Sequence, residues 1–157
     1  MSSIVGATVP VPQQAVTAVA LVDRLAEALN AAEIAYCHWK SNIGLAEATA
    51  GRTDLDLLVE RGAVSRAVGV LADAGFREAV SRWGEDPPGI RHYYGMDPET
   101  RRLVHVHLFS RVLTGESFVK SHLLPLETML LENTERVGPL RVAAKPAELV
   151  LFTLRLY

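Results

Sequence analysis

The sequence predicts a domain of the α+β or α/β class, and three patterns carry this prediction. Apolar residues recur at spacings of three and four in residues 13–32 and again in residues 62–74, which is typical of amphipathic helices. Short apolar runs bounded by turn-forming residues lie between and after these segments, which is typical of strands. Two such runs, Ile90–Met96 and Arg101–Phe109, flank a four-residue turn and indicate an antiparallel hairpin.

The length and composition are those of an ordinary globular domain. The chain has 157 residues, of which 49% are hydrophobic and 22% charged, and this fits one domain. A formal net charge of −2 argues against a dedicated nucleic-acid-binding domain, which is usually basic. The single cysteine, Cys37, excludes an internal disulfide and a thiolate zinc site, and it leads us to expect a cytoplasmic protein.

We expect neither a signal peptide nor a membrane span in the N-terminal region. We expect residues 1–12 to be a flexible tail and residues 13–157 to form the single domain. The tail lacks a basic region and contains two prolines, so it is a poor signal peptide. The apolar stretch Val16–Leu29 contains three charged residues, which disqualifies it as a membrane span. We therefore expect no membrane partner.

The first half of the domain is predicted to alternate helices and strands. Residues 13–32 form the first amphipathic helix. Ile34–Trp39 is a short β-like run, after which Ser41 is expected to cap a second helix that continues to about Thr49. Asp54–Val59 follows as an apolar strand.

The middle of the chain continues this alternation. A helix over residues 62–74 is expected to stop at Gly75. Phe76–Trp83 is then predicted as a strand, and the Gly- and Pro-rich segment of residues 84–89 as a turn before the hairpin.

The last third is less regular. Thr114–Lys120 is expected to be a loop, Leu126–Leu131 a short helix, and Arg136–Val142 a small hairpin. Pro146 occupies a first-turn position and opens a final helix, Ala147–Tyr157. That helix is strongly apolar to its end. We therefore expect either a chain cut from a longer protein or a helix that packs against a partner, such as a second copy in a homodimer.

Two aspartates stand at the start of the predicted strand 54–59. Side chains two apart in a strand point the same way, so Asp54 and Asp56 share one face. Adjacent carboxylates repel unless a cation lies between them, and the pair is therefore a candidate divalent-metal site. The alternative is that Asp54 simply suits the entry to a strand after the turn Gly51-Arg52-Thr53.

Lys40 and Ser41 lie at the predicted junction of a strand and a helix. The free amides at a helix start attract anions, and a lysine and a serine there could hold a phosphate. The 12 residues between Ser41 and Asp54 suffice for one helix and a return to an adjacent strand. The alternative is that Ser41 only caps the helix and that Lys40 is solvated.

These motifs resemble the nucleotidyltransferase superfamily, which has the DNA polymerase β-like fold. Its signature is a hydrophobic residue, Gly, then Gly or Ser, followed by Asp-x-Asp among hydrophobic residues, whereas this chain has Lys40 at the Gly position. The strings Tyr36–Asn42, Gly51–Val59 and Val104–Leu108 are similar to a bacterial branch in which the domain can precede a thymidylate kinase-like domain.

The resemblance implies a fold, a cofactor and a reaction. It implies an α+β core with a mixed β-sheet flanked by helices. Asp54 and Asp56 would hold Mg²⁺ or Mn²⁺, and Lys40 and Ser41 would contact the phosphates of an NTP. The expected activity is transfer of a nucleoside monophosphate from the NTP to an unidentified acceptor. Two alternatives stay open: a catalytically inactive nucleotide-binding or regulatory domain beside a kinase-like domain, and a toxin–antitoxin type transferase that modifies a partner protein.

Histidines stand where the resemblance implies a third acidic residue. Arg101–Phe109 contains no Asp or Glu, but His105 and His107 share a strand face there. His107 could act as the catalytic base, and the pair could ligate a transition metal; it could also be a hydrogen-bonded sheet surface that marks lost chemistry. His38 is assigned either to the core or to catalysis. His92 and the neighbouring arginines of the hairpin are assigned either to phosphate binding or to a solvated face.

Overall fold

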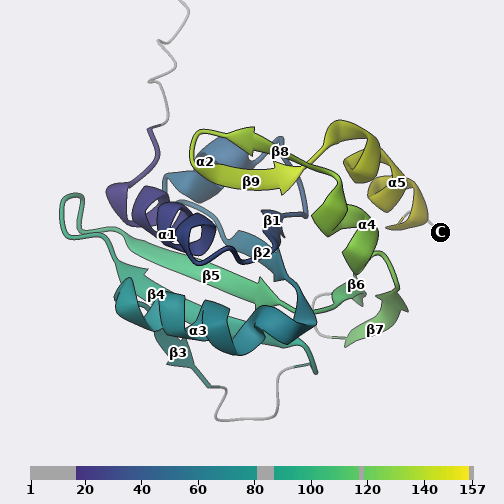
Figure 1. The fold of residues 1–157 in the computed structure, drawn as a ribbon, viewed down its shortest axis with the longest axis horizontal. Helices are drawn as coiled ribbons and strands as arrows, with labels where there is room; N and C mark the ends of the chain where they lie inside the picture. The colour runs from purple at the N-terminus through teal and green to yellow at the C-terminus, as the bar shows by residue number, and fades with distance from the viewer. Residues whose placement is uncertain (1–16, 81–86, 117–118, 156–157) are drawn as a thin grey trace, which may run out of the picture.

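The protein is described by a computed structural model that covers residues 17–80, 87–116 and 119–155 (Figure 1). The expected tail, residues 1–12, lies outside this range. In the described residues, a mixed seven-stranded sheet and a separate two-stranded hairpin are flanked by helices. The expected α+β class with a mixed sheet is therefore confirmed. No described helix combines the length and the hydropathy that a membrane crossing requires.

The large sheet has the strand order β3-β4-β5-β2-β1-β9-β8. Its strands are β1 (Tyr36–His38), β2 (Leu55–Val59), β3 (Arg77–Ala79), β4 (Ile90–Met96), β5 (Leu103–Phe109), β8 (Thr134–Val137) and β9 (Leu140–Ala143). Strand β2 lies at the centre, where it pairs antiparallel with β1 and parallel with β5. Strands β4 and β5 form the predicted antiparallel hairpin.

One face of the sheet packs against helices α1 (Ala20–Ala31) and α3 (Val64–Asp73), which Figure 1 shows lying across the front of the strands. Every second residue of β2 and β5 contributes to this core. The strand residues involved include Leu55, Leu57, Val104, Val106 and Leu108. The short helix α2 (Leu45–Thr49) adds Leu45 and Ala48 to the same cluster.

The second face of the sheet is covered only in part. Helices α4 (Glu127–Glu132) and α5 (Lys145–Arg155) pack over the β1 and β2 region. Trp39 meets the ring of Phe109 edge-on there, with the ring centroids 5.1 Å apart. Burial among these residues raises the pKa of the Cys37 thiol to about 12, so this cysteine is an inert core residue.

Most predicted elements are confirmed, with shifted ends. The first helix begins at Ala20, since Thr17–Val19 are not helical and residues 13–16 lie outside the described range. Helix α3 follows a short 3₁₀ turn (Arg61–Ala63) and ends before Gly75, whose φ of 95° suits glycine. Strand β3 is shorter than predicted, and part of that prediction, residues 81–83, lies outside the described range.

The prediction that Thr114–Lys120 forms a loop is wrong. Strands β6 (Val112–Glu116) and β7 (Val119–Leu124) form a hairpin in its place. Gly115, with a φ of 120°, sits where the pairing register shifts between Thr114 and Glu116. A glycine at such an irregularity bends a strand without ending it, whereas in the sequence it resembles a loop residue.

The last elements agree with the sequence. The predicted small hairpin corresponds to β8 and β9, which turn at Gly138 with a φ of 58°. Helix α4 occupies the predicted short helix, and α5 contains Pro146 in its first turn. Residues 156–157 of the predicted last helix lie outside the described range.

Asp97, in the turn between β4 and β5, joins the hairpin to the start of α1. The backbone N–H of Leu21 donates to Asp97 Oδ1 at 2.9 Å, and no side chain of α1 itself caps that helix end. Thr100 donates to Oδ2 through its N–H and its hydroxyl. These hydrogen bonds from Thr100 hold the pKa of Asp97 below its usual value. Asp97 therefore fixes the β4–β5 hairpin against α1.

We predict that Asp97→Ala lowers the free energy of unfolding by about 1–3 kcal/mol, because it leaves the buried N–H of Leu21 without an acceptor. Urea denaturation of wild type and variant measures the change. Glu99→Ala, an exposed position in the same turn, is the matched control and should stay within about 0.5 kcal/mol of wild type. Equal effects of the two substitutions would show that Asp97 has no special role.

Candidate functional site

Asp54 and Asp56 meet at the beginning of β2. Leu55 and Leu57 point into the core beneath α1 and α3, so Asp56 between them faces the second side of the sheet. Asp56 is buried, with 8% of its surface exposed, whereas about half of the Asp54 side chain is exposed. The two carboxylates thus lie at the protein surface, with Asp56 buried and Asp54 accessible to solvent.

Strand β5 brings His105 and His107 to these carboxylates. The parallel register places His107 directly opposite Asp56. His105 Nδ1 lies 2.8 Å from Asp54 Oδ1, and His107 Nδ1 lies 3.1 Å from Asp56 Oδ1. A carboxylate can only accept, so each neutral imidazole donates through Nδ1 and keeps its lone pair on Nε2. Burial, and next the neighbouring His107, lower the pKa of His105 and favour that neutral form.

Lys40 balances the buried carboxylate. Its Nζ lies 2.5 Å from Asp56 Oδ1 and 4.6 Å from the centre of the Phe109 ring. Burial acts to raise the pKa of Asp56, but the hydrogen bond from His107 and the charge of Lys40 outweigh burial, and the pKa lies below its usual value. Asp56 is therefore ionised and paired. The alternative of a solvated Lys40 is wrong.

The loop after β1 is held by contacts distant in sequence. The N–H of Asn42 donates to Glu148 Oε1 at 2.7 Å, and its side-chain amide donates to the carbonyl of Ala143 at 2.8 Å. His38 Nε2 lies 3.1 Å from the carbonyl of Ser41, so the ring donates there. These bonds fix Lys40 and Ser41 beside the aspartates.

Ser41 does not cap a helix, which corrects the sequence prediction. Helix α2 begins only at Leu45, its N-cap residue is Gly44, and no side chain caps it. The contacts of Asn42 hold the chain away from helical geometry for three further residues. With five residues, α2 is too short to offer the anion site expected at its start. Any phosphate contact by Ser41 would depend on its own hydroxyl and N–H.

The predicted site residues nevertheless come together at one cavity of about 230 Å³. It opens where β1 ends and β2 begins. The cavity is lined by His38, Lys40, Ser41, Gly44, Ala48, Thr53, Asp54 and Asp56. His107 does not line it but contacts both aspartates, at 3.1 Å from Asp56 and 3.7 Å from Asp54. The lining combines two carboxylates, one ammonium group, one imidazole and the hydroxyls of Ser41 and Thr53.

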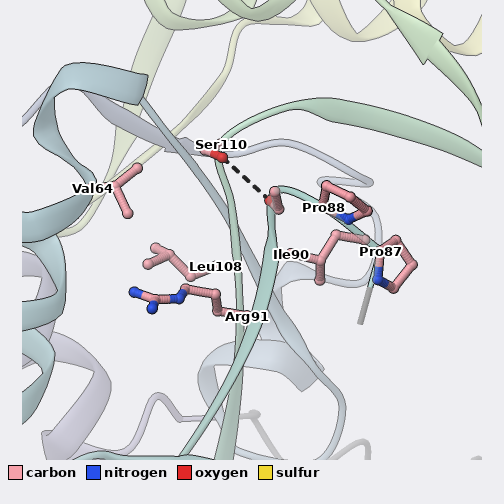
Figure 2. A pocket seen from close by; sticks show the side chains of 8 residues that line it. Val64, Pro87, Pro88, Ile90, Arg91, Leu108 and Ser110 are labelled. Atoms are coloured by element: carbon pink, nitrogen blue, oxygen red, sulfur yellow. Dashed lines mark hydrogen bonds between the residues drawn. The ribbon is translucent and has the colours of Figure 1, made fainter. Parts of the chain in front are cut away.

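Two other cavities lie away from Asp54 and Asp56, and the larger of them is lined by other charged residues, Asp23, Glu135, Lys145 and Glu148. Figure 2 shows one of about 250 Å³ beside the β4–β5 hairpin, where Arg91 points along a wall of apolar side chains. Arg91 is already paired with Glu78 at 3.1 Å. A larger groove of about 810 Å³ runs along α2, β8 and β9, and it shares no lining residue with the carboxylate cavity.

His92 is the residue whose place the sequence did not reveal. It lies on β4 opposite His107, and its Nδ1 is 3.2 Å from Nε2 of His105. The sequence predicted either phosphate binding or a solvated face for it. The predicted four-residue turn would set His92 opposite His105, whereas the observed pairing of Met96 with Leu103 sets it opposite His107.

The carboxylate pair fits a magnesium-type ion by its donor atoms. Oxygen ligands suit Mg²⁺, which keeps several waters and needs few protein groups. In the described part of the chain, the side chains of Lys40 and His107 both contact Oδ1 of Asp56, and Oδ2 therefore remains for a cation. Lys40 currently supplies the positive charge that such an ion would bring.

Comparisons of the chain with models of protein families, with curated proteins and with solved structures found no match. The function therefore has to be argued from the site.

We predict that the free energy of unfolding falls when the pH drops below about 6.5, through His38. This ring is 3% exposed, and its Nδ1 has no hydrogen-bond partner among the described residues. Burial lowers the pKa of His38, and the charge of Lys40 adds to this, despite the opposing charges of Asp56 and Glu148. The unfolded chain, with an ordinary histidine pKa, then binds more protons than the fold, so acid favours unfolding.

Urea denaturation at pH 7.5 and 5.5 measures this dependence, whose limit is about 1.4 kcal/mol per pH unit for one proton. His38→Gln should flatten the slope, and His122→Gln, at an exposed position, should leave it unchanged. A slope that His38→Gln does not alter would contradict the assignment.

Proposed function

We propose that this domain is a metal-dependent nucleotidyltransferase of the DNA polymerase β-like superfamily, which transfers a nucleoside monophosphate from an NTP to an acceptor. One observation carries the proposal. Asp54 and Asp56 open into the same small cavity as Lys40 and Ser41, so a pair of metal-binding carboxylates lies beside groups that bind phosphate.

The strand arrangement supports this assignment. In the resemblance drawn from the sequence, a later strand supplies a third acidic residue, where this chain has His105 and His107. Here β2 carries the aspartates and β5 runs parallel to it, with His107 opposite Asp56. Strand β1, which leads into Lys40 and Ser41, pairs with β2 on its other side.

Each residue has a role that follows from its contacts. Asp54 and Asp56 would hold Mg²⁺ or Mn²⁺, which when bound stabilises the negative charge on the phosphate oxygens. Lys40 contacts the phosphates electrostatically when Asp56 is balanced by another cation. The hydroxyl of Ser41 donates to a phosphate oxygen.

His107 is the proposed base. In the neutral ring, donation from Nδ1 to Asp56 orients Nε2 and leaves the lone pair there. Nε2 accepts the proton of the acceptor hydroxyl while that oxygen bonds to the α-phosphorus. The bond from the α-phosphorus to the bridging oxygen breaks at the same time, and pyrophosphate leaves with the electron pair.

A second candidate function is a catalytically inactive nucleotide-binding or regulatory domain. The observation that favours it is the ion pair of Lys40 with Asp56, which neutralises a carboxylate that catalysis would need for a metal. A transferase that modifies a partner protein, as in toxin–antitoxin systems, differs from the first proposal only in its acceptor.

Whether the domain is active or inactive, the exposed apolar side chains of helix α5 support a contact with another domain or chain. It exposes Leu149, Val150 and Leu154, of which Leu149 is 67% exposed. We therefore also propose that α5 packs against an adjoining kinase-like domain or a second copy of the chain. The reduced, buried Cys37 accords with the proposed cytoplasmic location.

We predict that wild-type protein, incubated with each α-labelled NTP, Mg²⁺ or Mn²⁺ and a cell extract, transfers label to an acceptor. Asp56→Asn should lower the rate at least about 100-fold, because it removes a charged metal ligand. Asp73→Asn, at an exposed position at the end of α3, is the matched control and should keep the wild-type rate.

The alternatives give different results in the same assay. If NTP and Mg²⁺ raise the melting temperature without any transfer, the inactive nucleotide-binding domain is the correct function, since bound ligand stabilises a fold by mass action. If neither transfer nor stabilisation occurs, both assignments fail.

A further inference from the structure

Three imidazoles converge on the second face of the sheet, beside the aspartates. His92 comes from β4, and His105 and His107 come from the adjacent strand β5. One ligand nitrogen from each ring lies within 4.8 Å of the others. All three residues are half-buried, on paired strands of the central hairpin. Rigid strands hold such a group more accurately than a loop would.

The distance between two of the nitrogens suits a shared ion. His92 Nδ1 and His105 Nε2 are 3.2 Å apart. Two nitrogens bound tetrahedrally to zinc at about 2.0–2.1 Å lie about 3.3 Å from each other. The same distance also suits an N–H···N hydrogen bond, so without a metal His92 donates through Nδ1 to Nε2 of His105.

The aspartates orient two of the rings. Asp54 accepts from His105 Nδ1 and Asp56 accepts from His107 Nδ1, which directs the lone pairs to Nε2. A carboxylate behind a ligating histidine in this way fixes the tautomer and strengthens the ligand. Tyr94 stacks on His105, with ring centroids 4.1 Å apart and planes 8° apart, and so fixes the ring plane.

We infer that His92, His105 and His107 form a binding site for a zinc-type transition metal, with Asp54 and Asp56 as orienting groups. Imidazole nitrogens suit Zn²⁺, Co²⁺, Ni²⁺ and Cu²⁺, whereas Mg²⁺ prefers oxygen. Three protein ligands leave a fourth tetrahedral position for water or a substrate atom. This site therefore differs in ligand chemistry from the carboxylate site proposed for Mg²⁺.

The inferred site does not depend on the proposed transferase activity. One consequence of the site does depend on that activity. A metal bound to Nε2 of His107 would occupy the lone pair with which this residue would act as the base. If the domain is a transferase, occupancy by zinc and proton transfer by His107 exclude each other.

The test is direct metal binding by untagged full-length protein. Titration of metal-free protein with Co²⁺ should give visible ligand-field absorption that saturates near one equivalent, and Zn²⁺ should displace Co²⁺. Competition with a chromophoric chelator gives the Zn²⁺ affinity. His92→Gln should weaken that affinity at least about tenfold, because it removes one of three ligands.

Controls separate the site from general histidine binding. His122→Gln, an exposed position on β7, should bind Zn²⁺ like wild type. Asp54→Ala should weaken binding about tenfold while all three ligands remain, as expected for an orienting carboxylate. Circular dichroism checks that each variant is folded. If Asp54→Ala does not fold, the comparison of His92→Gln with wild type is sufficient to test the site.

Three results would overturn the inference: no saturable Co²⁺ absorption, equal Zn²⁺ affinity of wild type and His92→Gln, or equal weakening by His122→Gln. Because binding is measured without nucleotide, a failed transfer assay does not affect this result.

Discussion

The parallel pairing of β2 with β5 is the constraint on which the site depends. The alternating leucines of β2 are committed to the core under α1 and α3, so Asp56 must face the other side. The register then sets His107 opposite Asp56. A slip of one residue would bring a carboxylate into the core and separate it from the imidazole. The hydrophobic pattern of the sheet thus determines the polar geometry on its second face.

The negative charge of a buried carboxylate has to be compensated, and for Asp56 other side chains of the same protein compensate it. Asp56 is only 8% exposed and is nevertheless ionised, because Lys40 and His107 contact the same oxygen. An unpaired charge at this depth would destabilise the fold by several kcal/mol. Under the proposed function, the ammonium group of Lys40, at the position where the superfamily signature has glycine, would supply the charge that a metal would otherwise supply. The site is therefore stable without an ion, and an ion has to compete with Lys40 for Asp56.

The sequence predicted features that depend on local pattern. It predicted β2, the β4–β5 hairpin, most helices and the shared face of Asp54 and Asp56, because side-chain periodicity alone determines these. The sequence-based prediction failed where contacts between residues distant in the sequence determine the structure. Ser41 looked like a helix cap, but Asn42 bonds to Glu148 and Ala143, more than 100 positions away, and delays the helix. His92 gained its place only from the register of a hairpin, which the predicted four-residue turn did not give correctly.

The two proposed ions would share the same carboxylates in different roles. Toward a magnesium-type ion, Asp54 and Asp56 are ligands through oxygen. Toward a zinc-type ion, they stand behind His105 and His107 and accept hydrogen bonds from Nδ1. A carboxylate oxygen that accepts from an imidazole has less electron density to give a cation. Each bound ion would therefore weaken the other, and reciprocity requires the weakening to be equal in both directions. The protein can then distinguish hard from softer cations with a single set of five side chains: two aspartates and three histidines.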